Sequence, residues 1–245
     1  MSTLLISDLH LDETRPHLTA ILLAFLAGRA RQAQALYLLG DVFEAWIGDD
    51  DRSPFNEQIA QALKAVVDAG VPVYFMHGNR DFMVAREFAQ RSGVQLLDDP
   101  TVVVLGGIRT LLSHGDRYCT ADPVYQAFRA RSRTPQWQRR MLRLPLFIRR
   151  WIAHRGRRKS ARHKAAGTAT PSISDVVDTA VAHEMQSLDV SRLIHGHTHR
   201  PAVHLLNLPR GQSERIVLAD WRAEGEALEV GEDGSYVRVP LRAGG

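Results

Sequence analysis

The stretch Ala35-Leu36-Tyr37-Leu38-Leu39-Gly40-Asp41 decides the fold. Five apolar residues in a row are typical of a buried strand, and Gly40 ends that strand directly before a carboxylate. Similar apolar runs lie before and after it, at Thr3-Leu4-Leu5-Ile6-Ser7 and at Val71-Pro72-Val73-Tyr74-Phe75-Met76. Helical patterns are expected at 18–30, 54–69 and 82–91. This alternation of strands and helices predicts an α/β core with a mixed sheet.

Further strands are predicted downstream. Thr101 to Leu105 and Ile108 to Ser113 read as two strands around a glycine turn, and Leu193-Ile194 begins another. A helix is expected over 174–188 with Ser174 as its N-cap, and 205–242 is strand-like. The second half of the chain is therefore expected to complete the same core.

Five of these strands end in a polar cluster. The clusters are Asp8-Leu9-His10, Gly40-Asp41, Gly78-Asn79-Arg80-Asp81, His114-Gly115-Asp116 and Gly196-His197-Thr198-His199. Ligands of α/β sheets bind at the carboxyl ends of the strands. We therefore expect the five clusters to converge on one pocket.

Seven side chains in these clusters are suitable metal ligands: Asp8, His10, Asp41, Asn79, His114, His197 and His199. Imidazoles and carboxylates suit manganese, iron and zinc. Seven ligands are too many for one tetrahedral site, so we predict two ions about 3.5–4 Å apart, bridged by the carboxylate of Asp41. The expected division places Asp8, His10 and His199 on one side, and Asn79, His114 and His197 on the other.

Each cluster taken alone also fits a solvated loop or an ordinary turn. All five in this order, each after an apolar strand, favour the dinuclear interpretation. Ligating imidazoles usually donate their second N–H to an acceptor, so Glu44 and Asp116 are candidates for orienting the histidines. His195 is expected to be structural or supporting rather than a ligand.

The composition is that of an ordinary globular protein. The chain has 245 residues, of which 44% are hydrophobic and 24% charged, which excludes a disordered or fibrous protein. A single cysteine, Cys119, excludes an intrachain disulfide framework and a four-thiolate zinc site. No apolar run approaches the roughly 18 residues that span a bilayer, and the N-terminus does not resemble a signal peptide. We expect a soluble protein of the reducing cytoplasm.

The positive charge is concentrated in one segment. Residues 123–174 contain no acid, and Arg129 to Lys164 carries 14 of the 31 basic residues, which leaves 17 against 27 acidic ones elsewhere. The sequence predicts a basic helical lid insert at 123–167 in a core of 1–122 and 168–245. Three interpretations stay open: packing on the core, docking on anionic lipid with entry of acyl chains, and RNA binding.

The motifs together resemble the calcineurin-like metallophosphoesterase superfamily, over residues 8 to 199. The resemblance implies a sandwich of mixed sheets flanked by helices. It also implies two metal ions that activate a water for hydrolysis of a phosphoester or a pyrophosphate. Many members carry a histidine after the Gly-Asn pair. Here that residue is Arg80, so the usual general acid is missing.

Longer runs at 40–50, 78–82, 125–129 and 195–204 are similar to the UDP-2,3-diacylglucosamine hydrolase family of lipid A biosynthesis. This resemblance implies two Mn²⁺ ions and a lipid-linked UDP-sugar substrate. The pyrophosphate bond would be cleaved by water attack on the α-phosphorus, which yields UMP and 2,3-diacylglucosamine 1-phosphate. It also implies a peripheral protein on the cytoplasmic face of the bacterial inner membrane, in contact with its anionic lipid. We expect a monomer without a nucleic-acid partner.

Site residues carry over from the family one by one. The expected catalytic residues are Asn79, Arg80 and His114. The expected substrate-binding residues are Asn79, Arg80, Asp122, Tyr125, Ser160, Lys164 and His197. Tyr125 either touches substrate or packs. The family has Asn and then Lys after Ser160, and Lys164 would supply that ammonium from a shifted position.

Two other functions remain open. A soluble nucleotide pyrophosphatase or phosphodiesterase would use the same core, but it would need no apolar insert. A lipid- or nucleic-acid-binding protein would need no complete set of seven ligands.

Overall fold

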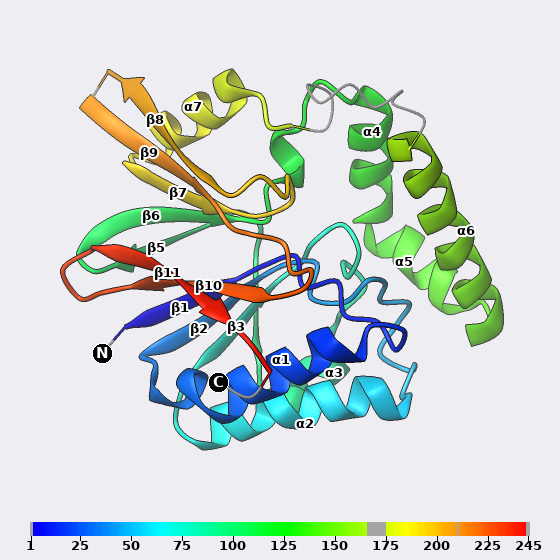
Figure 1. The fold of residues 1–245 in the computed structure, drawn as a ribbon. Helices are drawn as coiled ribbons and strands as arrows, with labels where there is room; N and C mark the ends of the chain where they lie inside the picture. The colour runs from blue at the N-terminus through cyan, green and yellow to red at the C-terminus, as the bar shows by residue number, and fades with distance from the viewer. Residues whose placement is uncertain (1, 166–174, 210, 244–245) are drawn as a thin grey trace.

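Two β-sheets packed face to face form the centre of the molecule (Figure 1). The computed structural model describes residues 2–165, 175–209 and 211–243, without the side chains of 159–165. The first sheet has the order β11-β10-β1-β2-β3-β4. Its strands are β1 (Thr3–Ile6), β2 (Ala35–Leu39), β3 (Val73–Met76), β4 (Gln95–Leu97), β10 (Gly225–Val230) and β11 (Tyr236–Leu241). Strands β1 to β4 are parallel, and β10 and β11 are antiparallel additions at one edge.

The second sheet has the order β5-β6-β7-β9-β8. Its strands are β5 (Thr101–Leu105), β6 (Ile108–Ser113), β7 (Arg192–His195), β8 (Ala202–Leu208) and β9 (Gly211–Val217). The three central strands β6, β7 and β9 are parallel, while β5 and β8 run antiparallel at the two edges. Both sheets are therefore mixed, as the sequence predicts.

Helices cover the outer faces of both sheets. The first sheet carries α1 (Pro16–Ala27), α2 (Pro54–Asp68), α3 (Arg86–Ser92) and the short η1 (Arg29–Gln32), and the second carries α7 (Asp178–Ser187) and η2 (Asp116–Tyr118). Side chains alternate along a strand. In β2, Leu36 and Leu38 pack under the helices, while Tyr37 and Leu39 face the other sheet. Burial of both faces explains the unbroken apolar run that decides the fold.

Two helices begin later than their sequence patterns predict. The pattern from Phe82 becomes helical only at Arg86, because the carboxylate of Asp49 accepts hydrogen bonds from the backbone N–H groups of Ala85 and Phe88 and caps the helix there. Helix α7 begins at Asp178, and the expected cap Ser174 lies outside the described residues. The short strand β4 had no clear pattern in the sequence.

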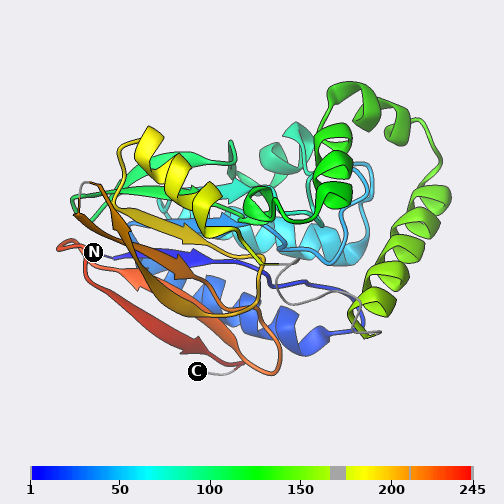
Figure 2. The ribbon, with the colours of Figure 1, turned by 90° about the horizontal axis from the view of Figure 1, so that it is seen from above.

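The basic segment folds into three helices: α4 (Pro123–Ser132), α5 (Pro135–Leu142) and α6 (Leu146–Ala165). Figure 2 shows them together at one end of the sandwich, apart from the helices that cover the sheets. The division into a core and a 123–167 lid remains a prediction. Within the part of the chain that the structure describes, no helix has the length and apolarity that a membrane span requires.

Candidate metal centre

The predicted ligands stand on sharply turned backbone. Asp8, His10, Asp41, His197 and His199 have φ angles of 56°, 49°, 52°, 70° and 55°. This left-handed region costs a residue other than glycine on the order of 1–3 kcal/mol. Backbone hydrogen bonds hold the turns in place, for instance from His10 N to the Asp41 carbonyl at 2.9 Å. Such strain collects at functional sites, and here it lies where the strand-end clusters meet.

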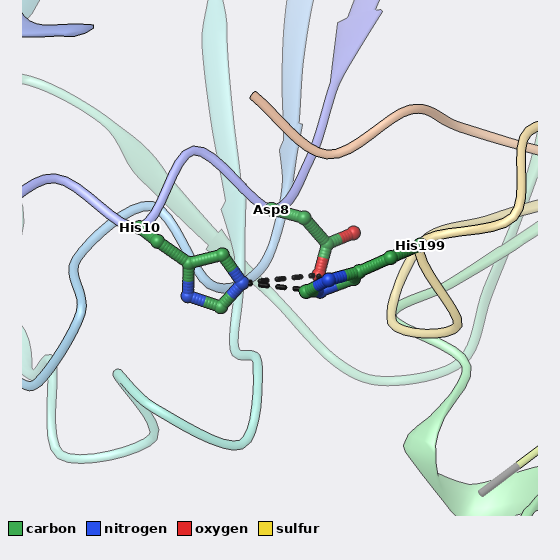
Figure 3. A group of neighbouring side chains, drawn as sticks. All are labelled: Asp8, His10 and His199. Carbon is green, nitrogen blue, oxygen red and sulfur yellow. Dashed lines mark hydrogen bonds and ion pairs between the residues drawn. The ribbon is translucent and has the colours of Figure 1, made fainter. Parts of the chain in front are cut away.

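Asp8, His10 and His199 form the first group (Figure 3). The Nε2 atoms of His10 and His199 are 3.1 Å apart, and His199 Nε2 lies 3.2 Å from Asp8 Oδ1. His10 Nε2 lies 3.9 Å from the same carboxylate oxygen. The structure thus brings together the three residues expected on one side of the centre.

Asp8, Asp41 and His114 form a second, fully buried group. Asp41 turns Oδ1 toward His114 Nε2 at 3.7 Å and Oδ2 toward His10 Nε2 at 3.9 Å, so its carboxylate lies between the two groups. Asn79 Oδ1 lies 3.1 Å from His114 Nε2 and 2.8 Å from His197 Nδ1. All seven predicted ligands therefore meet in one place.

Three of the histidine rings have a hydrogen-bond acceptor beside the Nδ1 atom, which orients the ring. His10 Nδ1 faces Glu44 Oε2 at 3.3 Å, His199 Nδ1 faces Asp220 Oδ2 at 3.4 Å, and His114 Nδ1 faces the Leu39 carbonyl at 2.9 Å. Each Nδ1 has an acceptor beside it, so in the neutral ring the proton belongs there and Nε2 carries the lone pair. Glu44 has the predicted role. Asp220 follows no motif and was not among the predicted site residues.

With the rings neutral, the centre is a cluster of hydrogen-bond acceptors. Lone pairs of His10, His199 and His114 point at one another, at Asp8 and at Asn79, with contacts of 3.1 to 3.9 Å. Converging acceptors repel unless positive charge lies between them. These imidazole nitrogens, carboxylates and one amide oxygen are therefore a set of metal ligands that fits divalent cations.

The electrostatics of the buried groups point the same way. Burial raises the pKa of Asp41 to about 6, although the nearby histidines favour its charged form. Burial alone would lower the pKa of His114, but the carboxylates of Asp41 and Asp8 raise it to about 9. Burial, together with the charge of His114, lowers the pKa of His197 to about 3, so its ring is neutral at pH 7. The carboxylates thus attract positive charge into a pocket with little solvent.

Asp81 joins two of the strand-end turns. Its buried carboxylate accepts hydrogen bonds from the backbone N–H groups of Val42 at 2.7 Å and Gly78 at 2.8 Å. The two turns lie so close that a Cβ on Gly78 would sit 2.1 Å from Asp41 Oδ1. Glycine is therefore the one residue that fits before Asn79, and Asp81 sets the spacing of Asp41 and Asn79.

Asp116 does not orient a ligand histidine by direct contact, contrary to the sequence expectation. Its fully buried carboxylate accepts hydrogen bonds from Arg129 Nε at 2.9 Å, from Arg133 at 3.2 Å and from the hydroxyl of Tyr125. All three donors come from α4 and the residue that follows it. Arg129 also pairs with Asp99 at 2.7 Å. Asp116 therefore attaches α4 to the loop that carries His114.

A cavity of about 480 Å³, called the lid cavity below, lies between the predicted metal ligands and the helices α4 to α6 of the basic segment. Its polar side is formed by the expected substrate residues Asn79, Arg80, Asp122, Tyr125 and His197. Its apolar side includes Phe82, Phe128, Trp137, Met141 and Ile152. The ring of Tyr125 lies nearly parallel to that of His197, with centroids 6.3 Å apart. Ser160 and Lys164 fall on α6, but their side chains lie outside the described residues.

Fold and centre together define a calcineurin-like phosphoesterase, and the family model described as calcineurin-like phosphoesterase matches residues 1–201. The chain is 53% identical over 234 residues to a UDP-2,3-diacylglucosamine hydrolase of Klebsiella pneumoniae, an alignment that covers 95% of this chain and 96% of the relative. The hydrolase of the same name from Escherichia coli O127:H6 is 51% identical over 233 residues, with the same coverage of both chains. The chain belongs to the UDP-2,3-diacylglucosamine hydrolase family.

A solved structure shares the fold at low sequence similarity. An archaeal phosphodiesterase superposes with a TM-score of 0.50 at 12% identity and covers 98% of this chain and 100% of its own. At that identity the likeness concerns the architecture alone. The expected class, a metallophosphoesterase sandwich, is confirmed.

Proposed function

We propose that this chain hydrolyses the pyrophosphate bond of UDP-2,3-diacylglucosamine and releases UMP and 2,3-diacylglucosamine 1-phosphate, with two Mn²⁺ ions held by the seven ligands. The observation that carries the proposal is the position of the cavity, whose polar wall is the metal centre and whose opposite wall is apolar. A lipid-linked pyrophosphate has the same two-sided character. The volume of the cavity is within the usual range for small-molecule sites, about 300–1,000 Å³.

Bound divalent ions would polarise the phosphoryl oxygens and lower the pKa of a coordinated water from 15.7 toward about 7. The side chains of the site supply binding and orientation. Asn79, on its tight turn beside Gly78, presents its amide to the phosphate. Arg80, held 3.6 Å from Glu44, offers a permanent positive charge to the phosphoryl oxygens as negative charge develops.

Arg80 also explains the missing general acid. An arginine does not give up its proton in proteins, so Arg80 is not a proton donor. For attack at the α-phosphorus the leaving group is a phosphate monoester, whose second pKa is about 6. Such a group leaves without protonation. A charge-neutralising arginine therefore suits a pyrophosphate substrate better than an acid designed to protonate an alkoxide.

We further propose that the protein works peripherally on the cytoplasmic face of the bacterial inner membrane, as a monomer. The lid presents exposed Phe147 and Trp151 among arginines on its outer side. Apolar anchors amid basic residues are the pattern of helices that lie on anionic lipid.

The test is release of UMP by protein stripped of metal and then supplied with Mn²⁺, measured on UDP-2,3-diacylglucosamine, UDP-glucose and an aryl phosphodiester. The lipid-linked substrate should be strongly preferred, and Asp41→Ala should abolish turnover. Hydrolysis in ¹⁸O-water should place the label in UMP. Equal turnover of UDP-glucose would indicate a soluble nucleotide pyrophosphatase, and no turnover of any substrate would indicate a binding protein.

A further inference from the structure

A second cavity opens on the opposite side of the metal centre. It has a volume of about 470 Å³ and extends from His10 and His199 to Arg15 and His17 at the start of α1 and to Arg222 after β9. Figure 3 shows the pair of histidines that faces it. No sequence motif points to this cavity.

The two cavities meet at Arg80 and Glu44, which line both of them. The lid cavity adjoins the metal centre at Asn79 and His197, whereas the second cavity adjoins it at His10 and His199. The metal centre thus lies between two chambers. A molecule bound across it would place one half in each chamber and its middle beside Arg80.

The second cavity differs from the lid cavity in chemistry. Three guanidinium groups line it, from Arg15, Arg80 and Arg222. Its two carboxylates are already engaged: Glu44 lies 3.0 Å from Arg15, and Asp220 lies 2.7 Å from Arg222. The net charge of these groups is positive, which favours an anionic ligand with polar substituents.

We propose that this second cavity is the nucleotide subsite, which takes the uridine monophosphate half of the substrate. The inference rests on the proposed function. Uracil and ribose carry many hydrogen-bonding groups, and burying such groups without hydrogen-bond partners is unfavourable. The mainly apolar lid cavity therefore suits the diacylglucosamine phosphate. The positively charged second cavity suits the nucleotide, and the pyrophosphate would lie beside Arg80.

His17 and Arg222 are the residues that we assign to nucleotide specificity. His17 Nε2 lies 2.9 Å from the Arg222 carbonyl, so α1 and the loop after β9 meet at the rim of the cavity. The Arg222 side chain is 75% exposed, and His17 is also exposed. Neither residue belongs to the core or to the metal ligands, so both can be replaced without removing buried packing.

The experiment measures binding by calorimetry to the full chain loaded with Mn²⁺. The probes are UMP, methyl phosphate and a short-chain 2,3-diacylglucosamine 1-phosphate. In the double variant His17→Ala/Arg222→Ala we expect UMP to bind about tenfold more weakly, approaching methyl phosphate. Methyl phosphate and the lipid phosphate should be unchanged within about twofold. Arg52→Ala, an exposed arginine on another surface, is the matched control and should alter none of the three.

Met141→Ala, in the lid cavity, provides the reverse comparison: it should weaken the lipid phosphate and spare UMP. Unchanged UMP affinity in the double variant, or equal weakening of UMP by Met141→Ala, would overturn the assignment.

The proposed function and the nucleotide subsite can be refuted separately. If wild-type protein binds UMP in a manner sensitive to His17 and Arg222 but does not cleave the lipid-linked substrate, the proposed function is wrong and the nucleotide subsite stands. If it cleaves that substrate and the double variant keeps the same KM, the subsite is wrong and the function stands.

Discussion

Asp220 and Glu44 each orient one histidine of the first ligand group. Each carboxylate faces the Nδ1 atom of a histidine, His199 or His10, and so leaves Nε2 unprotonated toward the centre. Each carboxylate also forms an ion pair, Glu44 with Arg15 and Asp220 with the largely exposed Arg222, and such an exposed pair contributes little. The tautomer of a ligand is thus determined by a residue that never touches the metal.

We predict that Asp220→Ala weakens Mn²⁺ binding about 10- to 100-fold, the usual effect of losing such a partner. The reason is that His199 would lose the acceptor that holds its proton on Nδ1. Titration calorimetry of the metal-free protein measures the effect. Asp68→Ala, an exposed carboxylate on α2, is the control. Wild-type affinity in Asp220→Ala would show that His199 needs no such partner.

At the scale of elements, α4 is held to the core by charge. Two buried carboxylates, Asp99 and Asp116, face the guanidinium of Arg129, and Arg133 adds a bond to the Gly78 carbonyl beside Asn79. One helix of the basic segment therefore contacts two of the loops that carry ligands. Removing one partner of a buried ion pair leaves an uncompensated charge, which costs far more than an exposed pair contributes.

Arg129→Met should accordingly lower the free energy of unfolding by about 3 kcal/mol, the low end of the range for a broken buried pair, because Arg133 still contacts Asp116. Arg129→Lys should recover part of the loss. Arg131→Met, an exposed arginine on the same helix, should change stability by less than about 0.5 kcal/mol. Urea unfolding compares the three variants, and equal effects at 129 and 131 would contradict the assigned role.

Among the α6 residues whose side chains are described, Arg149 is the buried attachment, beside the more exposed pairs Arg150–Asp51 and Arg157–Asp12. The Arg149 side chain is 3% exposed and donates to the Ile47 carbonyl at 2.6 Å, to the Leu144 carbonyl at 2.9 Å and to Asp50. We predict that Arg149→Met reduces the protection of α6 amides in hydrogen exchange and raises KM for the lipid-linked substrate several-fold. The neighbouring Arg150 is exposed, so Arg150→Met is the control. Full protection in Arg149→Met would place the attachment elsewhere.

At the scale of the whole molecule, the helices α4 to α6 carry a concentration of basic residues, and all acidic residues lie in the rest of the chain. The lid helices carry Phe147 and Trp151, 71% and 60% exposed, and the guanidinium of Arg155 lies over the Trp151 ring. These exposed residues and the apolar lining of the lid cavity belong to the same three helices, so the proposed docking on a bilayer would leave a lipid a short path into the site.

We predict that replacing the exposed lid arginines at 139, 140, 143, 150, 155 and 158 with glutamine abolishes sedimentation with vesicles that contain phosphatidylglycerol. Each such charge contributes about 1 kcal/mol at an anionic surface. Phe147→Ser/Trp151→Ser should weaken binding by a route that salt does not screen. Turnover of a soluble aryl phosphodiester should stay at the wild-type level, which shows that the metals remain. Undiminished sedimentation of the charge-reduced variant at physiological salt would refute membrane docking by this face.

The pattern of the sequence predicted the α/β core and the strand ends at which seven candidate ligands meet, while the two-sheet sandwich followed from the family resemblance. Short apolar runs bounded by glycine or polar residues are assigned to strands by their length, and a polar cluster directly after a parallel strand lies at the carboxyl edge of the sheet. Asp8, Asp41 and His114 were therefore predictable from local pattern. So was the basic segment, because a stretch of 52 residues without an acid is visible in composition alone.

Only the tertiary structure decided which groups support those ligands and how the site is divided. Asp220 and Asp49 act on residues far away in the chain, and no local pattern marks a carboxylate whose partner is set by packing. Asp116 was predicted to orient a histidine because it follows His114 and Gly115 in the motif. Its carboxylate instead accepts hydrogen bonds from Tyr125 and Arg129, which packing of α4 brings beside it. The second cavity arises where α1, the loop after β9 and the metal centre meet. A volume bounded by three segments distant in sequence exists only once the chain is folded.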